Sequence, residues 1–181
     1  MKTTNNGAVG PAQNGGLVHP ITLSEAIVSM LNKRIGDEYA AHYFYNAAAN
    51  WCNNVGYKTA AAFFTAEADS ELGHARGVQK YLIDWNALPQ IPKVETFYDF
   101  GNLPEIIDAA YKLELDLFNK YIKDSQSIFA VDLATFDFLK EYRDIQTTSV
   151  AEYSDMLNAL ALIDINDRLS LLEFEETYLG A

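Results

Sequence analysis

Three glutamates, a glutamine and a histidine stand at positions where a helical bundle would bury them. Read at alternating steps of three and four residues, four segments each carry an apolar stripe with a polar group near its middle. These groups are Glu38, Glu71, Glu114 and Gln146, and His74 follows Glu71 on the same helical face. Burying three carboxylates costs on the order of several kcal/mol per ion. Two divalent cations would offset this cost, and these ligands suit iron or manganese and accept zinc.

The distances of these groups from the predicted turns place them at one level. Glu38 and Glu71 lie at nearly equal distances from a turn near residue 54, and Glu114 and Gln146 at equal distances from a turn near residue 130. In an antiparallel helical pair, residues equally far from the turn lie side by side. We therefore expect all four groups to meet in one layer.

The histidine count makes this layer asymmetric. Histidine occurs only at positions 19, 42 and 74, so the chain has one Glu-x-x-His motif, whereas symmetric di-iron bundles carry two. Gln146 stands where the second would be. A core ion-pair network through Arg34 and Arg143 is an alternative, but two arginines do not balance Glu38, Glu67, Glu71 and Glu114.

Four long helices and one short helix are expected to position these groups. Thr22 or Ser24 caps the first helix, Asn53, Asn54 and Gly56 form the first turn, and Pro104 lies in the first turn of the third helix. The helices are predicted over about 22–51, 57–85, 103–129 and 133–163, and the short helix over 168–179. The 17-residue connection 86–102 can cross the length of a bundle. The prediction is an all-α, ferritin-like four-helix bundle with one long crossover and a short fifth C-terminal helix.

Composition indicates a single cytoplasmic domain. We divide the 181 residues into a flexible tail (1–20), the bundle (21–163) and the C-terminal helix segment (164–181). The net charge of −12 argues against nucleic acid as a partner and is compatible with cation traffic. The chain has neither an apolar signal-peptide core nor a run that could span a membrane. Its one cysteine, Cys52, fits a reducing compartment and is expected to be a small buried apolar group.

The sequence resembles the bacterial-type non-haem ferritins over about residues 22–179. The matching stretches are DEYAAHYFYNAAANWC, GYKTAAAFFTAEADSELGHA, TFDFLKEY and RLSLLEFE. The resemblance implies a ferroxidase that oxidises Fe(II) with O2 or H2O2 and stores the product in a homo-oligomer of 24 subunits. It also implies two irons per subunit. Haem is not expected, because bacterioferritins use a methionine on the second helix and this chain has methionines only at 1, 30 and 156.

The resemblance assigns a role to each residue of the predicted layer. Glu38, Glu71 and His74 match the first iron site, with Glu71 as the bridge, and Glu114 matches the second. Gln146 matches the position on the dioxygen-facing side. Tyr45 matches a tyrosine that hydrogen-bonds a ligand carboxylate or supplies an electron, although a plain core residue is the alternative. Together these six residues are the predicted catalytic set, and all but Tyr45 are predicted metal ligands.

The chain also departs from the family pattern. Positions of a third iron site carry Ser70, Ile145, Thr148 and Ser149, so that site is expected to be absent. Glu67 is expected to be an additional metal ligand, a group near the path by which iron enters, or a hydrogen-bond partner in the core. His42 is expected either to approach the metal site or to lie at an interface with its hydrogen bonds satisfied. Asp124, Asp132 and Asp137, near the second hairpin, either steer Fe(II) or form a solvated turn.

Two other functions remain open from the sequence. A di-metal oxidase or peroxide scavenger of the ferritin-like superfamily would keep the metal and lack storage. A structural bundle would use the glutamates and the histidine only as core polar groups. The prediction of an oxidation activity is based on the residues of the polar layer, whereas the prediction of iron storage is based mainly on the resemblance.

Overall fold

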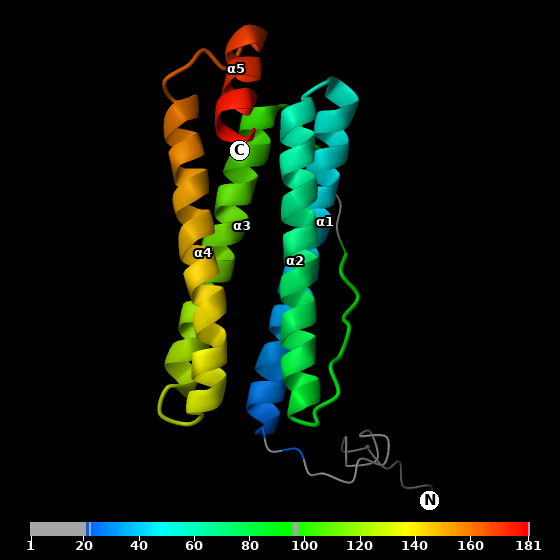
Figure 1. Cartoon of the computed structure of the whole chain (residues 1–181), viewed down its shortest axis with the longest axis vertical. Helices are drawn as coiled ribbons and strands as arrows, with labels where there is room; N and C mark the ends of the chain where they lie inside the picture. Colours follow the sequence, from blue (N-terminus) through cyan, green and yellow to red (C-terminus); the bar gives the residue numbers. More distant parts are fainter. Residues whose placement is uncertain (1–20, 22, 96–97, 181) are drawn as a thin grey trace, which may run out of the picture.

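The computed structural model describes residues 21, 23–95 and 98–180, and all regular structure within them is helical (Figure 1). The five helices are α1 (Glu25–Val55), α2 (Lys58–Asp84), α3 (Leu103–Ile128), α4 (Leu133–Leu160) and α5 (Arg168–Tyr178). The expected all-α class, with four long helices and a short fifth one, is confirmed. The tail predicted over 1–20 lies outside the described residues.

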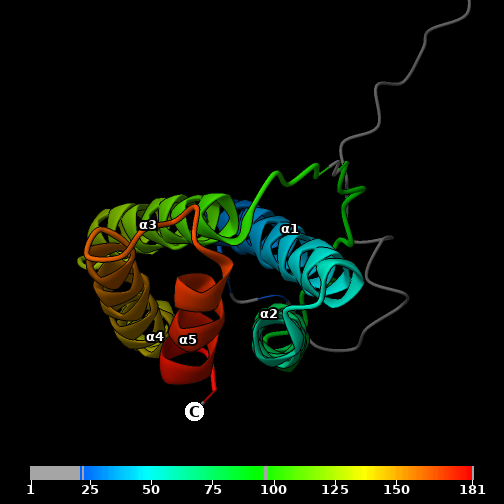
Figure 2. The same ribbon diagram turned by 90° about the horizontal axis from the view of Figure 1, so that it is seen from above.

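The four long helices form a bundle of two antiparallel pairs. α1 packs on α2 and α3 packs on α4, and the view along the bundle shows the four helices around a common interior (Figure 2). The connection after α2 runs along the outside of the bundle to the opposite end, so α2 and α3 are parallel (Figure 1). α5 lies over the end of the bundle that holds the α1–α2 turn. No described helix combines the length and apolarity that a membrane crossing requires.

Side-chain caps start three of the long helices. Ser24 accepts a hydrogen bond from the Ile27 backbone N–H at 3.3 Å, as predicted, while the alternative cap Thr22 is not described. Asn102 caps α3 through the Glu105 N–H, and Asp132 caps α4 through the Thr135 N–H, both at 2.9 Å. Each cap satisfies a backbone donor that the first helical turn leaves unpaired.

Two predicted helix ends were wrong. α1 continues through Asn53 and Asn54 to Val55, because the Lys58 ammonium binds the Asn53 carbonyl at 2.8 Å and Gly56, at φ 106°, provides the left-handed residue that ends the helix. α4 ends at Leu160 instead of Ile163. There the Ile163 N–H bonds the Leu160 carbonyl in a tighter turn, which an apolar run in the sequence cannot reveal.

α5 is attached to the bundle by hydrogen bonds to the start of α2. The buried Glu175 carboxylate accepts the Ala60 backbone N–H at 2.9 Å, and Thr59 donates to Glu176 at 2.6 Å. Glu175 therefore caps a helix that has no side-chain cap of its own. Cys52 is buried and unpaired nearby, as expected, and burial raises the pKa of its thiol to about 12.

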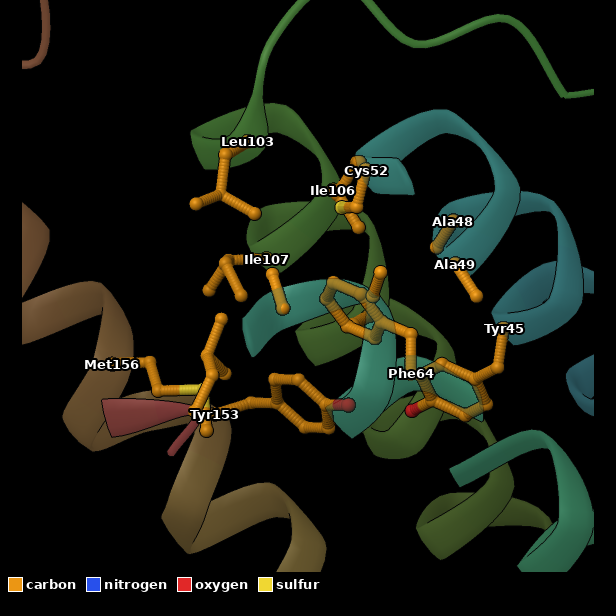
Figure 3. Packing of buried hydrophobic residues seen from close by; sticks show 14 of the residues in the cluster. Tyr45, Ala48, Ala49, Cys52, Phe64, Leu103, Ile106, Ile107, Tyr153 and Met156 are labelled. Carbon is orange, nitrogen blue, oxygen red and sulfur yellow. The ribbon is translucent and has the colours of Figure 1, made fainter. Parts of the chain in front are cut away.

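Two apolar clusters fill the bundle interior. In the upper cluster, near α5, the rings of Phe64 and Tyr153 both lie nearly parallel to the ring of Tyr45, and Ile107 and Met156 belong to the same cluster (Figure 3). The lower cluster, toward the α3–α4 turn, includes Leu31, Ile35, Val78, Tyr121 and Leu139. Fully burying such a side chain contributes about 1.5–3 kcal/mol. These contributions offset the cost of the polar layer that separates the two clusters.

Candidate metal centre

The five polar residues predicted from the stripes lie between the two clusters. Each long helix passes from one cluster to the other, and each carries its polar group at the crossing: Glu38 on α1, Glu71 and His74 on α2, Glu114 on α3 and Gln146 on α4. Glu38, Glu71, Glu114 and Gln146 are buried, and His74 is partly buried.

Glu38, Glu71 and His74 form a compact group of three. One ligand atom from each lies within 4.8 Å of the others, a separation suited to a shared metal ion. The His74 Nδ1 atom lies 3.2 Å from Glu71 Oε2 and 3.8 Å from Glu38 Oε2. Its side chain is 17% exposed, whereas that of Glu38 is fully buried. His74 is therefore the member of the group that borders solvent.

Glu114 lies outside that group of three, and its side chain is hydrogen-bonded by Gln146. The Tyr45 hydroxyl donates to Glu114 Oε1, which joins α1 to α3 through the predicted tyrosine. Glu114 remains close enough to Glu71 for its charge to raise the pKa of the Glu71 carboxyl. The layer thus holds a group of three ligands and, apart from it, a buried carboxylate paired with an amide.

Three buried oxygen atoms in this layer lack a hydrogen-bond partner: Glu38 Oε2, Glu114 Oε2 and Gln146 Oε1. Unpaired polar atoms are costly in an apolar interior and are rare in native structures. The second oxygen of each glutamate is occupied, since Tyr121 donates to Glu38 and Tyr45 donates to Glu114. The three oxygen atoms that accept no hydrogen bond are free to coordinate a metal ion. Hard or borderline divalent cations prefer such oxygen ligands.

Burial raises the pKa of all three carboxyls. The pKa of Glu38 lies well above its usual range because of burial and the adjacent Glu71 charge. Burial raises the pKa of Glu71 to about 8, with Glu38 opposing the shift and the Glu114 charge adding to it. Burial raises the pKa of Glu114 to about 7, although the Tyr45 hydrogen bond lowers it. Without cations, burial therefore favours the protonated form of all three carboxyls.

The ion-pair alternative is not supported by the arginines. Arg34 pairs with Asp37 at 3.1 Å and with Asp124 at 3.2 Å. Arg143 donates to Ser125 Oγ at 2.5 Å and to the Phe136 carbonyl at 3.2 Å. Both guanidinium groups therefore bind partners in the lower half of the bundle. Within the described residues, neither forms an ion pair with a glutamate of the layer.

The positions assigned to a third iron site offer no ligand set. Ser70 and Thr148 are exposed. Thr148 donates to the Asp144 carbonyl and Ser149 to the Ile145 carbonyl, each at 3.3 Å within α4. His42 also has a structural partner, since its Nδ1 atom lies 2.6 Å from the Ala68 carbonyl. The structure therefore favours the interface interpretation of His42.

The remaining acids have separate surroundings. Glu67 is half-buried, and burial together with the Glu152 charge raises its pKa. Asp124 binds Arg34 and Asp132 caps α4. Only Asp137 of the three hairpin aspartates is exposed. This arrangement favours a structural role for Asp124 and Asp132.

Tyr121 is a contact that the sequence reasoning missed. It is fully buried on α3 and donates to Glu38 Oε1. A signal was present, because Glu114 and Tyr121 repeat the seven-residue spacing of Glu38 and Tyr45. Each tyrosine binds the glutamate of the other helix, so α1 and α3 brace one another across the layer.

Known proteins share this architecture. The family model described as Ferritin-like domain matches residues 28–163. A probable bacterial non-heme ferritin-like protein of Haemophilus influenzae is 27% identical over 140 residues, which cover 76% of this chain and 85% of that protein. A bacterial non-heme ferritin of Escherichia coli is 27% identical over 142 residues, covering 77% and 86%. An open pore ferritin of Archaeoglobus fulgidus superposes with a TM-score of 0.83 at 21% identity over 90% of this chain and 99% of that one.

Proposed function

The chain belongs to the ferritin family, in its bacterial non-haem branch, and we propose that it is an iron storage and detoxification subunit with ferroxidase activity. The observation that carries this proposal is the buried layer in which four helices contribute ligands and leave three oxygen atoms unpaired. Iron is the substrate, and O2 or H2O2 is the oxidant. Haem has no part in the proposal.

Two Fe(II) ions would bind on the two sides of the layer. Glu38, Glu71 and His74 hold the first, Glu71 bridges to the second, and Glu114 holds the second with Gln146 beside it. The free oxygens of Glu38, Glu114 and Gln146 support this division. Two Fe(II) ions supply the two electrons that reduce O2 to H2O2, or H2O2 to water. Tyr45 orients Glu114 by donating to its outer oxygen.

Storage requires a closed assembly, and we propose a cytoplasmic cage of 24 copies. Both ends of the bundle expose large apolar side chains that one chain leaves uncovered. Phe129, Val131 and Leu133 are 58–75% exposed at the α3–α4 turn, and Leu162 and Leu169 are 87% and 71% exposed near α5. Exposed apolar residues grouped in this way are typical of contacts between protein copies.

A di-metal oxidase or peroxide scavenger without storage is the second candidate. The observation that favours it is the small number of metal ligands. At two positions assigned to a third iron site, the hydroxyls of Thr148 and Ser149 donate to backbone carbonyls of their own helix. Particle size separates the two functions, because a dimer has no interior in which to hold a mineral.

The activity is tested by mixing the metal-free protein with Fe(II) and O2 and recording the ferric absorbance. Glu71→Gln keeps the side-chain volume and replaces a carboxyl whose neutral form burial favours, so this variant is expected to fold. It should lower the initial oxidation rate by at least about tenfold, since even the loss of an outer partner of a metal site costs that much. The exposed neighbour Asp69→Asn is the matched control and should keep the rate. Equal rates in the two variants would refute the proposed centre.

A further inference from the structure

A cleft with a volume of about 340 Å³ lies between α2 and α4, and its lining extends to His74. Gly73 and Gly77 line it on α2, where neither has a side chain that would fill the space. A Cβ atom at Gly73 would meet nothing within 4 Å, so this part of the cleft is open. The cleft is therefore large enough to hold a small organic molecule.

Three aromatic rings form much of the cleft lining. The rings of Tyr81 and Phe138 stack with centroids 3.9 Å apart, and the Phe138 ring lies 5.3 Å from that of Tyr142 at 58°. Contacts of the hydroxyl groups hold two of these rings in place. The Tyr81 hydroxyl lies 2.9 Å from Thr135 Oγ1, and the Tyr142 hydroxyl donates to the His74 carbonyl at 3.2 Å. The three rings therefore lie at different angles around one space before a ligand arrives.

The charges of the cleft lining favour a positively charged ligand. The Lys80 ammonium lies 2.5 Å from the Asp84 carboxylate, so these two charges offset one another. His74 directs its Nδ1 atom to the Glu71 carboxylate at 3.2 Å. Glu141 is exposed and, within the described residues, forms no ion pair. The cleft thus keeps one uncompensated negative charge, in a chain whose net charge is −12.

This combination of rings and charge is suited to one class of cation. The face of an aromatic ring carries negative potential, and groups of such rings recognise quaternary ammonium ions. A metal ion such as Fe(II) prefers oxygen and nitrogen ligands, which the rings do not offer. The methyl groups of a quaternary ammonium ion, by contrast, pack against aromatic carbon while its charge remains attracted to a carboxylate.

We propose that the α2–α4 cleft binds a small organic cation of the quaternary ammonium class. The methyl groups of the cation lie against the rings of Tyr81, Phe138 and Tyr142, and its charge is balanced by Glu141. This site goes beyond the proposed function. It requires no metal, and it holds whether or not the chain oxidises iron.

Isothermal titration calorimetry of the full-length, metal-free protein tests the site with two probes of the same shape. Choline carries a trimethylammonium group, and its uncharged carbon analogue carries a tert-butyl group in the same place. Choline should bind at one site per chain and about tenfold more tightly than the analogue, because the ring faces attract only the cation. Equal affinities would overturn the proposal, as would the absence of choline binding at millimolar concentration.

Two variants test the groups that the proposal assigns to the cation. Phe138→Leu removes a ring and keeps an apolar side chain, and Glu141→Gln removes a charge at an exposed position. Each should weaken choline binding by about threefold to tenfold. Asp137→Asn is the matched control for Glu141→Gln, because Asp137 is an exposed acid of α4 outside the cleft lining. An equal loss in both charge variants would indicate general attraction to an acidic surface and would overturn the site.

Gly73→Leu tests the location of the site. The new side chain begins where a Cβ meets nothing within 4 Å, so the variant should fold and fill the cleft. It should abolish choline binding, and its melting temperature, measured in the same buffer, should not fall below that of the wild type. Choline binding that survives Gly73→Leu would place the cation elsewhere and contradict the proposal.

Discussion

Glu38 and Glu114 each divide their carboxylate oxygens between a tyrosine and the interior of the layer. The tyrosine bond fixes the side-chain rotamer, and the other oxygen remains free. A buried carboxylate held in this way is pre-organised for a cation, because the layer does not rearrange to present the ligand. Burial raises the pKa of both carboxyls when no cation is present, although each tyrosine hydrogen bond lowers it.

The raised pKa values predict how the stability of the metal-free chain depends on pH. In the folded state the pKa of Glu71 is about 8 and that of Glu114 about 7, above their values in an unfolded chain. The folded chain therefore holds more protons than the unfolded chain in this window, and its free energy of unfolding falls as the pH rises through it. Metal-free protein should melt at a lower temperature near pH 8.5 than near pH 5.5, on the order of 5 °C lower for about 2 kcal/mol.

The control for this prediction is Glu71→Gln, which removes one titrating carboxyl and should flatten the dependence measured by scanning calorimetry. The comparison separates the contribution of Glu71 to the pH dependence of stability from the contribution of general charge repulsion in a chain of net charge −12. Equal slopes in the wild type and the variant would mean that Glu71 is already ionised at low pH.

The sequence contained most of this layer because a polar residue inside an apolar helical stripe is conspicuous. Glu38, Glu71, Glu114 and Gln146 interrupt such stripes, and all four are buried where the turns predicted. Tyr121 was not identified as part of the site, because a tyrosine on an apolar stripe has the pattern of an ordinary core residue. Its role depends on where its hydroxyl lies, which the spacing alone does not determine.

At the scale of the helices, two glycines on the same face of α2 have opposite surroundings. A Cβ at Gly73 would meet nothing within 4 Å, whereas a Cβ at Gly77 would lie 2.5 Å from the Tyr142 hydroxyl. Tyr142 is packed against Tyr121 and Phe138, so it cannot move freely. The two positions therefore test the packing of α2 against α4.

Gly73→Ala should stabilise the protein by about 0.5–1 kcal/mol, because alanine has the higher helix propensity. Gly77→Ala should destabilise it in spite of the same gain, since the new methyl group displaces Tyr142. Urea unfolding of both variants measures the difference, and each serves as the control for the other. Similar shifts in the same direction would show that Tyr142 moves aside at little cost.

Helix ends were harder to predict than helix existence, for reasons visible at two ends. The end of α1 depends on Lys58, a residue of the next helix, which binds the Asn53 carbonyl. The end of α4 lies within an apolar run whose Leu162 is exposed. A contact from the next helix stabilises the end of α1, and a tighter turn ends α4, and local propensity encodes neither feature.

At the scale of the whole molecule, the 17-residue connection determines the fold class, and we propose that the exposed apolar ends make the contacts between copies. The connection was predictable because its length and two prolines exclude a simple hairpin. The number of copies was not predictable from one chain, because it depends on the angles at which surfaces of separate copies meet.

The exposed apolar ends predict a specific defect in assembly. Val131→Asp and Leu169→Asp introduce a charge at side chains that are 75% and 71% exposed in the single chain. If these residues are covered by other copies, each variant should shift the particle to smaller species in light scattering coupled to size exclusion. Val131→Ile is the conservative control and should assemble normally. Unchanged particle size in both aspartate variants would place the contacts between copies elsewhere.

The most direct test of the central claim is anomalous diffraction at the iron edge from crystals soaked anaerobically in Fe(II). The account predicts two iron peaks inside each bundle. One should lie among Glu38, Glu71 and His74, and the other beside Glu114, with Glu71 between them. Iron found only on the outer surface, with no peak in the buried layer, would contradict the account.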